Sequence, residues 1–259
     1  MSARVVAVTV APVKGLRALA REEVELGARG VRENRRFFLL DADDRMVNGK
    51  RFGALQAVLA EYADAERTLS LRFPDGALVS AAVEPGRRLV ARFFSSTIAA
   101  IEVLGPWSDA LSQHVGAPLR LVESHSDWGA VDRGREGAVS LISSASIERL
   151  AQAAQAARPI DARRFRMLFE IDGTAAHEED QWLGRPLRIG AALVTLRGHV
   201  GRCVVTKRDP ESGVSDLDTL NALASYRGEA ATTEPLACGV YGTVLQAGTV
   251  RIGDAVELI

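Results

Sequence analysis

The residues with the clearest capacity for chemistry surround one cysteine, Cys203, in the run GHVGRCVVTKRDPESG that ends at Gly213. Arg202 precedes the cysteine directly, and Lys207 and Arg208 follow it closely. Positive charge beside a thiol favours the thiolate, which is the form that attacks electrophiles and binds soft metals. The same pattern also fits a cysteine packed in a strand ahead of a turn, because most free cysteines are inert packing residues. Residue chemistry alone leaves both interpretations open.

Two further groups are weaker candidates. The run His177 to Asp180 carries three consecutive carboxylates, for which a solvated acidic loop is favoured over a metal cluster. Cys238 could pair with Cys203 or act as a second thiol, and a buried packing cysteine is the favoured interpretation. The histidines and cysteines show no zinc-type spacing, and the chain has no phosphate-cradling glycine loop and no G-x-S-x-G nucleophile motif.

Composition sets limits on partners and compartment. The 259 residues suffice for one large or two modest domains, and the formal net charge of −1 gives no field toward nucleic acid or an anionic membrane, so neither partner is expected. The first ten residues resemble neither a signal peptide nor an anchor, so a cytoplasmic location is expected. Two cysteines cannot hold a four-cysteine iron–sulfur cluster. A redox enzyme of this sequence would receive electrons from another protein.

The pattern of elements predicts an α+β, mostly β fold. Short β-rich runs divided by turns fill the first 105 residues and indicate a barrel or sandwich, followed by a helix over residues 106–115. A polar stretch over 123–137 suggests a division into domains at 1–122 and 123–259. In the second part, helices are expected over 144–157 and 216–226, and strands over 187–200, 204–206 and 249–258.

The cysteine run resembles the R-C-x-x-T-x-x-D-P-x-[ST]-G signature of the MOSC family, named after the C-terminal domain of molybdenum cofactor sulfurase. Other segments are similar to that family in the same order, and they are residues 140–147, 163–166, 179–182, 189–190, 225–227, 241–242 and 248–256. Upstream, PVKG at 12–15 and RFFLL at 36–40 resemble the N-terminal β-barrel domain that precedes MOSC in the mitochondrial amidoxime-reducing component and its bacterial relatives. The resemblance implies a β-barrel-like N-terminal domain followed by a MOSC β-barrel flanked by helices.

The resemblance also implies a site. Cys203 would be the catalytic residue and the protein ligand of the metal in a molybdenum cofactor, Mo-molybdopterin. The residues expected to bind the cofactor are Lys14, Gly15, Arg36, Arg166, Gly201 and Arg202. Two departures stand out, because the family often has Asn at the position of Leu168 and Ser at the position of Gly201. Both departures would remove polar side chains from the expected surroundings of the cofactor.

Three functions follow from the resemblance. The first is an oxidoreductase that reduces N-hydroxylated compounds (amidoximes, hydroxylamines) or S-oxides, with a small N-oxygenated molecule as substrate and a ferredoxin-like or flavoprotein reductase as separate electron donor. The second is a sulfur carrier or cofactor-transfer protein in which Cys203 holds a persulfide. The third is a non-catalytic binding module that has lost the metal, which only the departures at Leu168 and Gly201 favour.

Overall fold

The first strand, β1 (Ala3–Val10), completes a barrel whose other strands all come from the second half of the chain. The computed structural model describes residues 3–259. Around the barrel the strands follow the order β14, β13, β17, β16, β15, β19, β1, and a β1–β14 pairing closes the ring. Their bounds are β13 Val139–Ser143, β14 Phe169–Asp172, β15 Pro186–Ile189, β16 Ala192–Gly201, β17 Ala237–Gln246 and β19 Ala255–Leu258.

The barrel is held by apolar side chains that point inward from alternate positions of its strands. In β1 these are Val5, Val8 and Val10, which are almost fully buried, whereas Arg4, just before Val5, is exposed. They pack against the aromatic ring of Phe169 from β14 and against aliphatic side chains of the barrel interior. Burial of this kind contributes roughly 1.5–3 kcal/mol for each large side chain.

Further short strands extend the same half of the molecule. β2 (Leu19–Arg21) pairs with β1, and β3 (Glu23–Gly27) lies between β4 (Gly30–Val31) and β18 (Gly248–Arg251). Strands from residues 3–31 thus pair with strands from beyond residue 168. The division of the chain at residues 122 and 123 stays a prediction.

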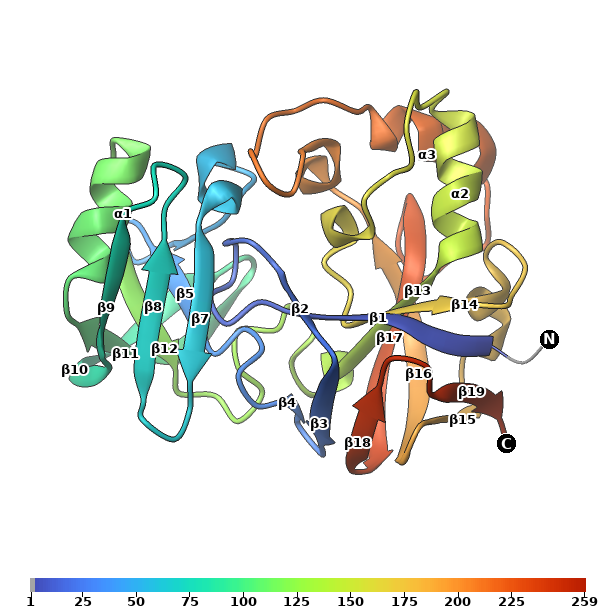
Figure 1. Ribbon diagram of the computed structural model, residues 1–259, viewed down its shortest axis with the longest axis horizontal. Helices are drawn as coiled ribbons and strands as arrows, with labels where there is room; N and C mark the ends of the chain where they lie inside the picture. The colour runs from blue at the N-terminus through green and yellow to red at the C-terminus, as the bar shows by residue number, and fades with distance from the viewer. Residues whose placement is uncertain (1–2) are drawn as a thin grey trace.

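The other half of the molecule holds two sheets and one helix (Figure 1). One sheet has the order β10 (Glu84–Phe93), β11 (Ser96–Leu104), β12 (Arg120–Ser124), β5 (Phe37–Leu40) and β6 (Met46–Val47). The other is a meander of β7 (Leu59–Ala63), β8 (Thr68–Arg72) and β9 (Leu78–Ala82). Helix α1 (Trp107–Val115) is tied to the meander by Trp107, whose indole Nε1 donates to the carbonyl of Leu69 at 3.0 Å.

Helices α2 (Ser144–Ala153) and α3 (Thr219–Arg227) flank the barrel, as the sequence predicts, and the mostly β, α+β fold is confirmed. Ser143 caps α2 by accepting from the backbone N–H of Ser146 at 3.1 Å. The expected strand over residues 204–206 is wrong. Residues Val204–Lys207 form a 3₁₀ helix, η5, because the Thr206 amide and hydroxyl both turn back to the Cys203 carbonyl. Between residues 3 and 259 no helix is long and apolar enough to cross a membrane.

Candidate functional site

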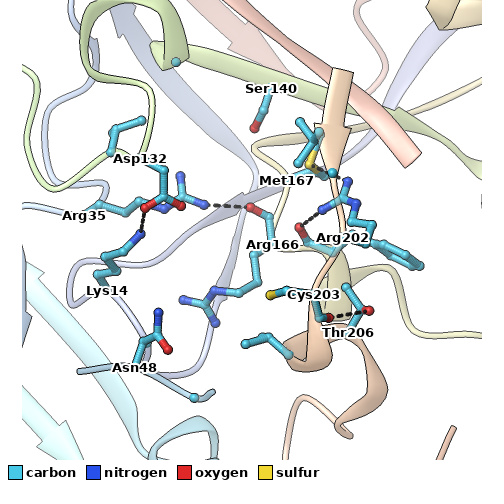
Figure 2. Close-up of a pocket in the computed structure, with 18 of the residues that line it drawn as sticks. Lys14, Arg35, Asn48, Asp132, Ser140, Arg166, Met167, Arg202, Cys203 and Thr206 are labelled. Atoms are coloured by element: carbon cyan, nitrogen blue, oxygen red, sulfur yellow. Dashed lines mark hydrogen bonds and ion pairs between the residues drawn. The ribbon is translucent and has the colours of Figure 1, made fainter. Parts of the chain in front are cut away.

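A cavity of about 350 Å³ lies between the two halves of the molecule and is lined by residues from both (Figure 2). From the first hundred residues it receives Lys14, Gly15, Arg35, Asn48 and Phe94, among others. From the barrel half it receives Ser140, Arg166, Met167, Gly201, Arg202, Cys203 and Tyr241, among others. Six of the seven residues expected to form a site from sequence therefore line one cavity, and Arg36 is the exception.

Cys203 stands where strand β16 has ended and the chain turns into η5. Its backbone is extended (φ −134°, ψ 177°), and its carbonyl accepts from the amide and the hydroxyl of Thr206, each at 3.0 Å. The residue is half-buried, and its sulfur is turned toward the middle of the cavity (Figure 2). The turn thus fixes the backbone and leaves the thiol available to a ligand.

Arg202 acts on the cavity through the backbone around it. Its Nε donates to the Cys238 carbonyl at 2.7 Å, its Nη1 to the Phe165 carbonyl at 2.8 Å, and its Nη2 lies 3.1 Å from the Met167 sulfur. Burial lowers the pKa of this guanidinium to about 10. These contacts tie Arg202 to the segment of Phe165 and Met167 and to Cys238 on β17, and they position the neighbouring Cys203.

Three other cations that line the cavity are the buried Lys14 and the half-buried Arg35 and Arg166. Lys14 is 6% exposed, and its Nζ lies 2.7 Å from Asp132 Oδ1. Arg35 donates to the Arg166 carbonyl at 2.9 Å, and Arg166 Nη1 donates to the Leu16 carbonyl at 2.7 Å. Among residues 3–259, Arg166 Nη2 is one of the few buried side-chain donors without a partner. This arrangement leaves donor capacity directed at a ligand.

The electrostatic balance of the cavity favours an anion. Burial lowers the pKa of Lys14 to about 8, with Arg35 and Arg166 adding to the effect and Asp132 opposing it. Burial likewise lowers the pKa of Arg166 to about 10, again with help from Arg35. Asp132 is the one acidic residue that lines the cavity, and its side chain is 41% exposed. A bound anion would relieve the repulsion among these cations.

Two glycines let backbone segments approach closely at the site. Gly15 has φ +95°, and a Cβ there would lie 3.1 Å from the Asn48 Cα. The Gly201 amide donates to Glu234 Oε2 at 2.8 Å, and a Cβ on Gly201 would meet that same oxygen at 2.8 Å. Glu234 also accepts from Arg133 Nε at 3.0 Å. The carboxylate of Glu234 therefore lies where a serine side chain, common in the family at position 201, would extend.

The structure separates Arg36 from this site. Its guanidinium lies 2.8 Å from Asp64 and 2.7 Å from Glu123, over the ring of Tyr62, and it lines a neighbouring cavity of about 540 Å³. The preceding residue, Arg35, is the one that reaches the cavity of Cys203. Sequence reasoning missed Arg35, which lies in a turn with a positive φ of 55°, so the alternation of an extended chain does not tell which arginine of the pair faces the cavity.

The departure at Leu168 has a different meaning from the one expected. Leu168 is 2% exposed and packs in the barrel core, and the cavity wall is made instead by its neighbour Met167. The Leu168 amide donates to the hydroxyl of Ser140 at 3.0 Å. Leucine at this position therefore removes no polar side chain from the cavity.

The acidic run after His177 is structural. It forms the 3₁₀ helix η4 (Glu178–Trp182), and the expectation of a solvated loop is wrong, because Glu179 is fully buried and accepts hydrogen bonds from Ser143 and Ser146 at the start of α2. Asp180 pairs with Arg227 at 2.7 Å. Within residues 3–259 no three His, Cys, Asp or Glu side chains form a group that could hold a metal ion.

Cys238 is a packing residue. It is fully buried beneath the cavity wall among Ile142, Phe165 and other apolar side chains. Burial raises the pKa of its thiol to about 12, and Arg202 opposes this only in part. Both cysteines are free thiols, and of the two only Cys203 is partly exposed.

Two family profiles match successive parts of the chain. The profile of the MOSC N-terminal beta barrel domain matches residues 2–107, and that of the MOSC domain matches residues 127–257. Mitochondrial amidoxime-reducing component 1 of Xenopus laevis is 27% identical over 95% of this chain and 79% of its own length. Mitochondrial amidoxime reducing component 2 of Homo sapiens is 36% identical over 36% of this chain and 29% of its own. The crystal structure of the YUAD protein from Bacillus subtilis is 11% identical, with a TM-score of 0.47 over 100% of this chain and 96% of that one.

Proposed function

Because this chain belongs to the MOSC family, we propose that it is a molybdenum-cofactor oxidoreductase that reduces N-hydroxylated compounds (amidoximes and hydroxylamines) or S-oxides. A relative that aligns with 95% of this chain is named mitochondrial amidoxime-reducing component 1. The observation that carries the proposal is the cavity itself, in which the half-buried thiol of Cys203 lies with the cations Lys14, Arg35 and Arg166 and a single carboxylate.

The residues present fit an anionic cofactor with a soft metal. Thiolate sulfur is a ligand suited to such a metal, and Cys203 is the only cysteine that lines the cavity. A phosphate group needs cations and N–H donors, which Lys14, Arg35 and the unpartnered Nη2 of Arg166 offer. When bound, the cofactor would supply the two-electron redox chemistry that side chains lack.

The chain's own residues would hold the cofactor, orient it and neutralise its negative charge. Arg202 fixes the wall beside Cys203, and Glu234 fixes the Gly201 amide two residues ahead of it, so the thiol meets the cofactor in a set position. Removal of a hydroxyl oxygen as water consumes two electrons and two protons. The chain has only two cysteines and no iron–sulfur cluster ligated by four, so we infer a separate ferredoxin-like or flavoprotein donor.

A second candidate is a persulfide carrier that uses Cys203. It is favoured by the half-buried, free state of this thiol beside the cations of the cavity, which would also stabilise a persulfide anion. Mass spectrometry of the intact protein distinguishes the two candidates. An adduct of one sulfur atom on Cys203 in protein free of molybdenum would favour the carrier.

The test is metal analysis of protein expressed with molybdate in a host that makes the cofactor. We expect near-stoichiometric molybdenum in wild type and in the matched control Cys238→Ala, and its loss in Cys203→Ser. Reduction of benzamidoxime or an aryl sulfoxide by a chemical electron donor should follow the metal. Full molybdenum in Cys203→Ser, or loaded wild type inactive on both substrates, would refute the proposal.

A further inference from the structure

An exposed aromatic residue, Phe94, stands at the mouth of the cavity on a turn that does not favour it. Only Phe94 and Ser95 separate the paired residues Phe93 and Ser96 at the end of the β10–β11 hairpin. Of the two loop residues only Phe94 has a positive φ, 56°. Glycine or asparagine is the usual residue at such a position, because a bulky side chain is strained there. The folding of the hairpin therefore gives no reason for phenylalanine.

The aromatic ring of Phe94 contacts residues on the side of the hairpin that faces the cavity. Phe94 is 52% exposed, yet it lines the same cavity as Cys203. The ring of the buried Phe93 supports it edge-on at 5.4 Å between centroids. Two ammonium groups lie near its ring centre, Lys14 at 5.9 Å from inside the cavity and Lys50 at 5.1 Å from the rim. An interior and a rim cation thus lie near the ring, and the residue is about half exposed.

We propose that Phe94 determines substrate specificity by forming a platform on which the aryl or heteroaryl part of an N-hydroxylated substrate stacks. The inference rests on the proposed function and names a substrate class for it. A flat aromatic group of the substrate stacks on the exposed part of Phe94. The ammonium groups of Lys14 and Lys50 beside it favour electron-rich rings. With the ring of the substrate held at the mouth, its N–O group is left to enter the cavity. A small aliphatic amidoxime has no face to stack and gains nothing from Phe94.

A structural explanation makes a different prediction. If Phe94 only covered Lys14, its replacement would change the binding constants of all ligands of the cavity by the same factor. If Phe94 is a platform, its replacement changes the ratio between aromatic and aliphatic ligands. Stability gives a second readout, because glycine adopts positive φ freely. Phe94→Gly should therefore melt no lower than wild type and still lose the aromatic preference.

The experiment measures equilibrium binding of benzamidoxime and acetamidoxime to molybdenum-loaded protein by calorimetry, without reductant. We expect Phe94→Ala and Phe94→Gly to weaken benzamidoxime binding about tenfold and to leave acetamidoxime within about twofold, while Phe94→Trp keeps the preference. The matched control is Leu78→Ala, which removes an apolar side chain of similar exposure, 55%, from the distant strand β9. It should change neither constant.

Different results would overturn the Phe94 platform and the proposed reductase function. A wild type that binds benzamidoxime no more tightly than acetamidoxime, or a Phe94→Ala variant that keeps the wild-type ratio of the two constants, would overturn the platform even where reduction proceeds. If wild type binds benzamidoxime more tightly than acetamidoxime, Phe94→Ala loses this preference, and wild type reduces neither compound, the proposed function is overturned and the platform stands.

Discussion

Replacing Lys14 by methionine should stabilise the protein at neutral pH while weakening the cavity for anions. Burial lowers the pKa of Lys14 from 10.5 to about 8, with Arg35 and Arg166 adding to the effect and Asp132 opposing it. A drop of this size means that the folded state disfavours the charged lysine by roughly 3 kcal/mol at pH 7. Methionine fills similar space without charge. Asp132 loses its partner, but its side chain is 41% exposed and regains water. The net gain is therefore about 1–3 kcal/mol.

The pH dependence follows from the sign of the shift. The folded pKa of Lys14 lies below the unfolded one, so below pH 8 both states are protonated and the full penalty is present. Between pH 8 and 10.5 the unfolded state binds more protons than the folded state, and wild-type stability rises with pH through this group. The advantage of Lys14→Met should accordingly shrink across that window.

Urea unfolding of cofactor-free protein at pH 7 and near pH 10 measures both effects. The control is Lys50→Met, which removes an exposed lysine from the rim of the same cavity and should change stability by less than about 0.5 kcal/mol. Inorganic phosphate should stabilise wild type more than Lys14→Met, because it binds the folded cation site. A Lys14→Met variant less stable than wild type at pH 7, or a stability difference that does not vary with pH, would refute the reasoning.

Three further outcomes are expected. Native protein without cofactor should react with one equivalent of a thiol reagent at Cys203 and none at Cys238, whose pKa burial raises to about 12, and a Cys203→Ser variant that still reacts would contradict this. Gly201→Ala should lower the free energy of unfolding by about 1–3 kcal/mol, because the added Cβ meets Glu234 Oε2 at 2.8 Å. If this clash is the cause, the same substitution made in a Glu234→Ala background should lower it much less. Ser143→Ala should lower the free energy of unfolding by about 1–2 kcal/mol or more, because it removes both the α2 cap and a donor to the buried Glu179, and an unchanged midpoint in urea would show that neither contact contributes.

Local patterns predicted the mostly β fold, whereas the residues expected around Cys203 came from the resemblance to the MOSC family. Alternating apolar residues specify strands, and the segment around Cys203 carries its chemistry within a few residues. The choice between Arg35 and Arg36 depends on which side of one short segment faces the cavity, and the residue types do not record it. Leu168 was misjudged for the same reason, since a shift of one residue moves a side chain from cavity wall to barrel core.

The acidic run after His177 could not be interpreted from local pattern, because its partners lie far away in sequence. Charged residues usually sit in water, yet Glu179 is fully buried among the hydroxyls of Ser143 and Ser146, more than thirty residues earlier. A buried carboxylate is tolerated only where hydrogen bonds replace water, and those donors come from the first turn of α2. Only the tertiary structure brings them together.

The pairing of β1 with β14 explains why cations so distant in sequence share one cavity. Val8 lies opposite Phe169, and the Thr9 amide donates to the Leu168 carbonyl at 2.8 Å. The strands are antiparallel, so the chain that leaves the end of β1 runs beside the chain that enters β14. Lys14 follows β1 and Arg166 precedes β14, which places both at the same end of the pair. The strand that closes the barrel thereby also assembles the cation site, so barrel closure and anion binding should be lost together when this pairing is broken.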